Sequence, residues 1–460
     1  MRLISKKTMS DVRRPLNEKG IALLLVISSI VILTMVGVEF AYNAQIEYNL
    51  ATRQKERLQA YYLAYSAYNL VRLELKMGNQ VQAQVQSAVA KANINVSADL
   101  STPLCQQFPM KTALFRMVLA GQTGEAEGEA KPEEENAEGE KTDKPNEATS
   151  EMLAGLPLQG GEDFLQFSGD FDGECVDEGS KIDLNFFYAQ DPSKKADGTS
   201  SAYDEYKKFI ISMLSQKNYQ DLFKDGNIKV TEVVRNIADW IDPNESVSEF
   251  GGSEGGPEDS AYHGLSSGQM AAKNGKLSTP DDIYRVEGVQ ESWWAPIADL
   301  FTIYGTTSPQ GKPQINVCRA PNEVVSALIL RYTETRSDLP PLRAEDEEML
   351  SELVATVKKG CTGAIPDKNK IAADLDAKLL ELLKATPGSG GQNQPGKGAP
   401  GYGGQGSPFS EWIATQSRFF SLKLLGQVND TVVNINAVID LGNPPSGDTA
   451  KWKTVYWKID

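Results

Sequence analysis

The chain has 460 residues, which exceeds one ordinary hydrophobic core and leaves room for roughly two or three domains. Its hydrophobic content of 40% is that of a folded globular protein, and 62 Asp and Glu against 46 Lys and Arg give a net charge of −16. A surface this acidic repels phosphate backbones and anionic membrane surfaces. The composition therefore argues against nucleic-acid binding.

The N-terminus joins a basic leader to an apolar run. The leader, MRLISKKTMSDVRRPLNEKG, holds six basic and two acidic residues, a charge of +4, so the rest of the chain carries −20. Residues 21–38 form an uncharged run of 18, the lower end of what spans a bilayer, and Tyr42 suits the interface beyond it. Positive charge before the run places the N-terminus in the cytoplasm and sends the bulk of the chain outward.

A cleaved secretory signal peptide is one interpretation of this run, but no small-x-small cleavage site follows it. The later apolar positions recur at spacings of three or four: Ala60, Ala64, Ala67, Val71 and Leu75. No proline interrupts residues 21–100. The pattern predicts one helix, with a membrane-spanning part over 21–42 and a periplasmic part over 43–100. About 55 helical residues would rise roughly 80 Å.

A short basic leader ending in Gly20, an apolar half-helix and an amphipathic half-helix resemble the type IV pilin and pseudopilin family. The resemblance implies that a prepilin peptidase cuts between Gly20 and Ile21, that Ile21 is then N-methylated, and that neighbouring helices pack into a filament core. Pilins usually carry glutamate at the fifth mature position, where this chain has Leu25. A carboxylate in a bilayer needs a partner, so a subunit without one has no need of a neighbour above it. The minor pseudopilin K of type II secretion shares that departure.

Two segments beyond the helix are too poor in apolar residues to fold. Residues 121–150 are dense in Glu, Gly and Lys and contain alanine as their apolar type, so they predict a disordered acidic loop. Residues 386–408 are rich in glycine and proline and predict a flexible loop.

The remaining segments change periodicity twice. Residues 101–185 include strand-like alternation and form the first part of a pilin domain. Residues 186–312 are helix-rich and predict an all-α insertion, and residues 313–460 add further helices before the chain ends in strands. This order predicts an α+β fold, in which a pilin domain is interrupted by the helical insertion.

Three strand-like runs close the chain, at 418–428, 431–440 and 451–459. Asn429-Asp430 between the first two is a good tight-turn pair. We expect an antiparallel meander that wraps the soluble half of the N-terminal helix.

The sharpest local signature is IADWIDPNESVSEFGGSEGGPEDSAY, residues 237–262. Asp239 and Asp242 lie three residues apart at a helix end fixed by Pro243, and more carboxylates follow in a glycine-rich loop. Clustered oxygen ligands in a bendable loop suit Ca²⁺, which takes about six to eight of them. A solvated acidic loop is an equally weighted alternative on charge content.

Three segments resemble successive blocks of the minor pseudopilin K family. They are the run at 237–262, LSTPDDIYRVEGV at 277–289 and INVCRAPNEVVSAL at 315–328. The resemblance covers the N-terminal 60 residues and about 180–335. That family has a large helical insertion in a pilin fold and binds calcium there, so the resemblance implies a structural Ca²⁺ site. The matching ligand positions are Asp239, Asp242, Asn244, Glu258 and Asp259.

The four cysteines lie far apart, with no C-x-x-C pair, and the chain has one histidine, His263. A zinc site would therefore need an unusual set of ligands. In an exported domain they allow three disulfide pairings, and free buried cysteines are the alternative. We favour Cys105–Cys175 with Cys318–Cys361, because each bond would close off a disordered or helical excursion.

The blocks at 277–289 and 315–328 also resemble helix-hairpin-helix (SAM-like) units, in which a V-x-G-V turn cradles a DNA phosphate. Such use needs nearby Lys or Arg, but Glu287 and Glu291 flank this turn and Arg285 is nearly alone. A hairpin that packs within the protein is favoured. The alternative function is a minor pilin of a type IV pilus or competence system that binds DNA through these blocks.

Catalysis has little support in the sequence. The sequence shows no pattern of a catalytic nucleophile with its base: it has one histidine, no G-x-S-x-G motif and no cysteine beside a base. A hydrolase built on Asp239 and Asp242 is compatible with composition alone. We therefore expect a protein that is not an enzyme.

The leading hypothesis is a minor pseudopilin of type II secretion, at the pseudopilus tip, that initiates or caps the filament for export of folded proteins across the outer membrane. A bulky insertion would clash with a subunit stacked above it, and Leu25 removes the demand for one. Implied partners are other minor pseudopilins in a tip complex and the prepilin peptidase, with the secreted substrate or outer-membrane secretin as further candidates, and no nucleic acid. The implied location is the bacterial inner membrane, crossed once, with the bulk of the chain periplasmic.

Overall fold

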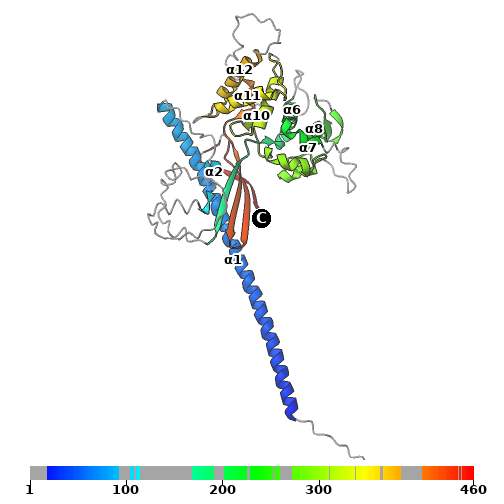
Figure 1. Cartoon of the computed structure of the whole chain (residues 1–460), viewed down its shortest axis with the longest axis vertical. Helices are drawn as coiled ribbons and strands as arrows, with labels where there is room; N and C mark the ends of the chain where they lie inside the picture. The colour runs from blue at the N-terminus through cyan, green and yellow to red at the C-terminus, as the bar shows by residue number, and fades with distance from the viewer. Residues whose placement is uncertain are drawn as a thin grey trace, which may run out of the picture.

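The computed structural model describes residues 18–92, 104–107, 110–113, 168–190, 201–224, 228–251, 254–258, 272–309, 311–336, 338–362, 366–384, 407–443, 445–446 and 448–460. The predicted acidic loop at 121–150, most of the leader and most of the Gly/Pro loop at 386–408 lie outside these residues. The described chain has three parts: a long N-terminal helix, a sheet packed on that helix, and a helical body beyond one end of the sheet (Figure 1).

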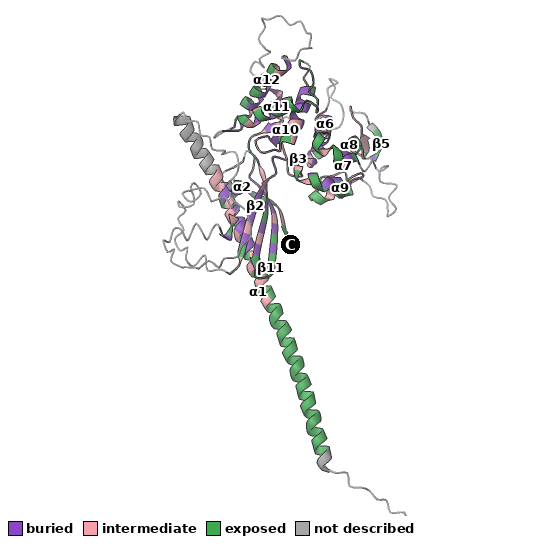
Figure 2. Cartoon of the chain, viewed as in Figure 1, coloured by how far each residue is buried: buried purple, intermediate pink, exposed green. Residues whose placement is uncertain are grey.

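The N-terminal helix, α1 (Glu18–Ala92), is one unbroken element of 75 residues, or about 110 Å at 1.5 Å per residue. The most apolar stretch of this helix has a mean hydropathy of 2.8 and is not buried. By length and composition the helix is able to cross a membrane. Figure 2 shows this half of α1 as exposed along its whole length. The predicted helix is present up to Ala92, and residues 93–100 lie outside the described chain.

An antiparallel sheet of five strands lies on the other half of α1, in the order β1-β2-β10-β11-β12. Its strands are β1 (Met110–Lys111), β2 (Asp170–Asp177), β10 (Phe419–Val428), β11 (Thr431–Asp440) and β12 (Lys453–Ile459). The predicted tight turn joins β10 to β11, with Asn429 at a φ of 51°, a left-handed conformation that asparagine tolerates. The α+β fold expected from the sequence is confirmed.

The contact between α1 and the sheet depends on small residues. Ala60, Ala64 and Ala67 are fully buried, and α1 packs on β2, β10 and β11. At Gly426 of β10 the backbones approach so closely that a Cβ atom would lie 1.9 Å from the carbonyl oxygen of Ala60. A disulfide between Cys105 of α2 (Leu104–Gln107) and Cys175 of β2 closes the other side of this core.

The helical body is inserted between β2 and β10 and has one continuous hydrophobic core. Its helices are η1 (Leu184–Ala189), α6 (Ala202–Leu214), α7 (Lys217–Lys224), α8 (Val230–Ile241), η3 (Pro280–Arg285), α9 (Glu291–Trp294), η4 (Ala295–Leu300), α10 (Asn322–Glu334), α11 (Glu347–Gly360), α12 (Lys368–Lys384) and η5 (Pro408–Glu411). Trp293 and Trp294 are buried in that core. Cys318 and Cys361 form a second disulfide, which joins the segment before α10 to the end of α11. The two disulfides have the pairing that the sequence favours.

The insertion also contains short strands, so it is helical without being all-α. They are β3 (Ile182–Asp183), β4 (Ser246–Ser248), β5 (Glu254–Pro257), β6 (Phe301–Thr302), β7 (Thr306–Thr307), β8 (Pro313–Asn316) and β9 (Ile413–Ala414). They pair as β3-β6, β4-β5 and β7-β8-β9. Strands of two to four residues give no period in the sequence, because alternation needs more residues to be visible.

A buried polar junction holds the helical body on the end of the sheet. Asp177, the last residue of β2, accepts a hydrogen bond from Ser417 at 2.7 Å and pairs with Arg319 at 3.4 Å. Burial raises the pKa of Asp177, and the Arg319 charge opposes that shift. Asn316 adds a bond from its amide nitrogen to Ser417 at 2.8 Å. The body is therefore fixed to the sheet by a network and not by a single connection.

Replacement of Gly426 by alanine is predicted to lift α1 from the sheet, because the new Cβ meets backbone that has no room to move. We expect Gly426→Ala to lower the free energy of unfolding by about 1–3 kcal/mol, measured by urea denaturation of the detergent-solubilised chain. Gly256→Ala is the matched control, since nothing lies within 4 Å of its added Cβ. Equal stability of the two variants would contradict the close approach.

Candidate cation site

The end of α8 places the first two acidic side chains of the site. Val233, Val234 and Ile237 bury one face of this helix, and Pro243 follows its C-cap, Asp242. Proline has no N–H for the next turn, so the helix ends there. Asp239 and Asp242 are three residues apart, and such a pair lies on one side of a helix.

A hairpin of β4 and β5 brings the third carboxylate to the same place. The Glu258 N–H donates to the carbonyl oxygen of Glu245 at 3.2 Å. One carboxylate oxygen from each of Asp239, Asp242 and Glu258 then lies within 4.8 Å of the other two. The three residues are 5%, 0% and 3% exposed, so the cluster is inside the protein. Three of the five sequence-predicted ligands are brought together.

Of the other two predicted ligands, the structure describes Asn244 alone. Asn244 donates to Asp242 from its backbone N–H at 3.1 Å and from its side chain at 2.7 Å, and its side-chain oxygen accepts from the Ser246 N–H at 2.8 Å. In this geometry Asn244 orients Asp242. Asp259 lies outside the described residues, as does His263.

Further donors hold the two aspartates in place. The Ser248 N–H donates to Asp239 at 3.0 Å, and the Tyr203 hydroxyl donates to Asp242 at 2.5 Å. Burial raises the pKa of Asp239 to about 7, the Ser248 N–H opposes the shift, and the charge of Asp242 adds to it. Burial is also the main cause that raises the pKa of Asp242. Burial therefore disfavours the charged form of both aspartates.

A buried lysine supports the site from α6. Lys207 is fully buried, pairs with Asp204 at 3.1 Å and donates to the Ser248 carbonyl at 2.7 Å. Its charge faces Asp239 as well, yet burial lowers the pKa of its ammonium group. Asp204 is the ion-pair partner of Lys207, and the Lys207 charge also acts to lower the pKa of Asp239 and Asp242, so Lys207 offsets part of the negative charge of the cluster.

Sequence reasoning did not find Tyr203, Asp204, Lys207 or Ser248. The available signal was the Asp204-x-x-Lys207 spacing within an otherwise apolar helix face, since a buried charge needs a nearby partner. The three residues of α6, Tyr203, Asp204 and Lys207, lie 35 to 39 residues from Asp242 in the chain, which hides the connection in a single sequence.

The helix-hairpin-helix block packs within the protein. Gly288 has a φ of 88° in the turn, where the Trp293 indole donates to its carbonyl at 3.2 Å. The Asn236 side chain of α8 donates to the Glu287 carbonyl at 3.1 Å. The turn is thus attached to α8, next to the cation site.

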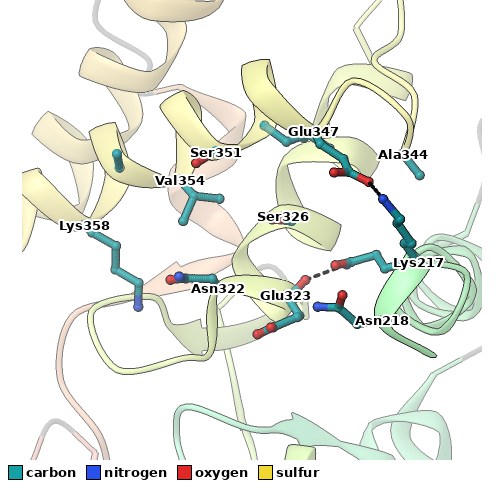
Figure 3. Close-up of a pocket in the computed structure, with 13 residues that line it drawn as sticks. Lys217, Asn218, Asn322, Glu323, Ser326, Ala344, Glu347, Ser351, Val354 and Lys358 are labelled. Atoms are coloured by element: carbon teal, nitrogen blue, oxygen red, sulfur yellow. Dashed lines mark hydrogen bonds and ion pairs between the residues drawn. The ribbon is translucent and has the colours of Figure 1, made fainter.

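A pocket of about 500 Å³ lies where α7, α10 and α11 meet (Figure 3). An ion pair between Lys217 and Glu347 at 3.1 Å lies at one side, and Gln216 donates to the Glu323 carbonyl at 2.7 Å. Lys358 donates to the Val317 carbonyl at 2.9 Å. The side chains that line it are mostly polar or charged, from the start of α7 and the facing sides of α10 and α11.

Comparison with known proteins finds a low similarity to solved structures. No protein-family model matches the chain, and no curated protein matches it. A solved structure of the GspK-GspI-GspJ complex from the type 2 secretion system of enterotoxigenic Escherichia coli matches with 16% identity and a TM-score of 0.37. The match covers 64% of this chain and 80% of that chain. Identity and TM-score at these values do not assign the chain to a family.

Lys207→Met is predicted to destabilise the helical body, because it leaves Asp204 as a buried charge without its ion-pair partner. We expect a loss of roughly 3–5 kcal/mol in the free energy of unfolding, measured by urea denaturation. Asp204→Asn added to this variant should recover part of the loss. Lys224→Met, at a largely exposed ion pair, is the control and should change stability by less than about 1 kcal/mol. A Lys207→Met variant as stable as the parent would contradict the assigned network.

Proposed function

We propose that the chain is a minor pseudopilin at the tip of a filament anchored in the bacterial inner membrane. It initiates or caps that filament for the export of folded proteins across the outer membrane, and its role is structural and not catalytic. The observation that carries the proposal is the arrangement in Figure 1: one continuous helix joins an exposed apolar half to a sheet, and a bulky helical body lies beyond the far end of the sheet.

The exposed half of α1 supports the proposal that the chain assembles into a filament. A solvent-facing apolar surface of this length needs lipid or other helices around it. We propose that the leader is cut between Gly20 and Ile21 by a prepilin peptidase, that Ile21 is methylated, and that the helix packs with those of other minor pseudopilins. The secreted substrate and the outer-membrane secretin are further proposed partners.

The helical body supports the tip position. It lies beyond the end of the sheet that faces away from the membrane half of α1 (Figure 1). A subunit stacked directly above would collide with it, whereas the membrane half of α1 remains accessible to neighbours below. Leu25, in the uncharged segment, provides no carboxylate for the amine of a neighbour above.

We also propose that Asp239, Asp242 and Glu258 bind a structural Ca²⁺, with Asp259 as a further ligand. Three buried carboxylates within 4.8 Å of one another are a donor set that a hard cation prefers, and such a cation would offset their mutual repulsion. The site joins α8 to β5 and lies against α6. Calcium would therefore stabilise the contact between α8, β5 and α6, which come from three separate segments of the chain.

The tip position predicts a copy number that does not depend on filament length. Antibodies against the helical body should label one end of isolated filaments, and quantitative mass spectrometry should find about one copy per filament. The same sample should contain a chain that begins with N-methylated Ile21, which controls for processing. Label along the whole filament would contradict the tip position, and an N-terminus beyond residue 40 would contradict the pilin-type helix.

The calcium proposal predicts that added Ca²⁺ raises the melting temperature of the full chain and that a chelator lowers it. At about 100 times the dissociation constant, bound ligand contributes about 2.7 kcal/mol, which corresponds to a few degrees for a domain of this size. Asp242→Asn keeps the shape of the side chain and should abolish the shift. Asp281→Asn, at an exposed position, should preserve it. A parent protein whose melting temperature responds to neither reagent would contradict the calcium proposal.

A further inference from the structure

The inner face of the sheet, on which α1 lies, extends beyond the helix at β12. Trp457 and Ile459 stand opposite Ala437 and Ile435, and directly opposed residues of an antiparallel pair point to the same face. Ala437 and Ile435 belong to the core that α1 forms with the sheet. Trp457 and Ile459 therefore point to the α1 side, but Ile459 is 46% exposed.

The width of the sheet explains this overhang. A helix is about 10 Å across and strands are about 4.8 Å apart, so one helix covers about two or three strands. α1 packs on β2, β10 and β11. It reaches β12 through Tyr65 and Tyr68, whose ring centres lie 6.2 and 5.1 Å from that of Trp457.

The flank of α1 beside β12 continues the same apolar surface. Leu58, Tyr61 and Tyr65 are spaced by three and four residues, so they lie on one helix face. Tyr61 and Tyr65 stack with ring centres 6.3 Å apart, and Leu58 is 57% exposed. We name the five residues the α1–β12 surface: Leu58, Tyr61, Tyr65, Trp457 and Ile459.

The chemistry of this surface selects a helix over a strand. β12 is an edge strand, but its pairing with β11 is interrupted by an irregularity at Val438 and Ile439, and Lys453 begins it. Bulges and lysines discourage addition of another strand at an edge. The α1–β12 surface instead has a helical seam on one side and a sheet face on the other, and α1 itself shows that this sheet face accepts a helix.

We propose that the α1–β12 surface binds the amphipathic helix of a second membrane-anchored subunit, parallel to α1. Because α1 is continuous from its apolar half to Tyr65, a helix that rises from the same membrane beside it meets this surface without changing direction. The tyrosine hydroxyls supply a polar rim around the apolar contact. The inference rests on the proposed function and adds the side of α1 on which the neighbour lies.

Site-specific photo-crosslinking tests the surface in the full chain, in its native membrane. Benzoylphenylalanine is placed at Tyr65 or Ile459, with two controls: Ser66, about 100° around α1 from Tyr65, and Lys423, which is exposed on β10. We expect products at Tyr65 and Ile459, mapped by mass spectrometry to the N-terminal helix of another prepilin-type protein. Yields at both control positions should be at least tenfold lower.

A second variant separates contact from folding. Ile459→Asp should reduce the Tyr65 product at least tenfold, while Lys423→Asp should leave it unchanged, and both chains should retain their two disulfides. Products with a second copy of this chain or with a non-helical segment would overturn the proposal, as would an undiminished Tyr65 product in Ile459→Asp.

The outcomes also distinguish this surface from the proposed function. A prepilin-type partner that crosslinks at Ser66 in place of Tyr65 would overturn the α1–β12 surface while the function stands. Absence of any prepilin-type partner at all four positions and at Leu33, in the membrane half, would overturn both.

Discussion

The close approach of α1 to β10 is the contact on which the rest of the structure depends. Gly426 and Ala60 meet at backbone distance, so the helix and sheet behave as one rigid unit. Because α1 has no break between its apolar half and this contact, the position of the sheet relative to that apolar half follows from a single helix. The polar junction at Asp177 then extends this rigidity to the helical body, which the chain inserts between β2 and β10.

The same contact also produces an asymmetry. A single helix cannot cover five strands, and α1 is placed over β2, β10 and β11, so β12 is left with an apolar inner face beside the helix. On the same face, at the β2 end of the sheet, the disulfide links α2 to β2. One flank of α1 is therefore closed by the chain itself, whereas the other carries Leu58 and Ile459 in contact with solvent. If the chain assembles as proposed, one closed flank and one open flank give the assembly a defined direction.

The parts of the fold that follow local rules are the parts that the sequence predicts. β10 alternates over its ten residues, β11 alternates over its first part, and Asn429-Asp430 joins them, so period and turn chemistry agree. α1 is equally visible, because its apolar run and small-residue spacing have no proline between them. The short strands β3 to β9 do not show in the sequence, since two to four residues carry no period. Asp239 and Asp242 were found from their spacing at a helix end, but Lys207 and Tyr203 were not, because their contact with β4 and α8 crosses about 40 residues of chain.

The buried acidic cluster has a physical reason that its local sequence does not reveal. A hairpin as short as β4-β5 buries little apolar area, so polar groups must attach it to the helices behind it. Lys207 does this through the Ser248 carbonyl, and Asp239 does it through the Ser248 N–H. Each attachment places a charge in the interior; Asp204 pairs with Lys207, and the Lys207 charge also reaches Asp239. The carboxylates of Asp242 and Glu258 then add negative charge next to Asp239, and a divalent cation bound between them would turn that repulsion into a cross-link between α8 and the hairpin.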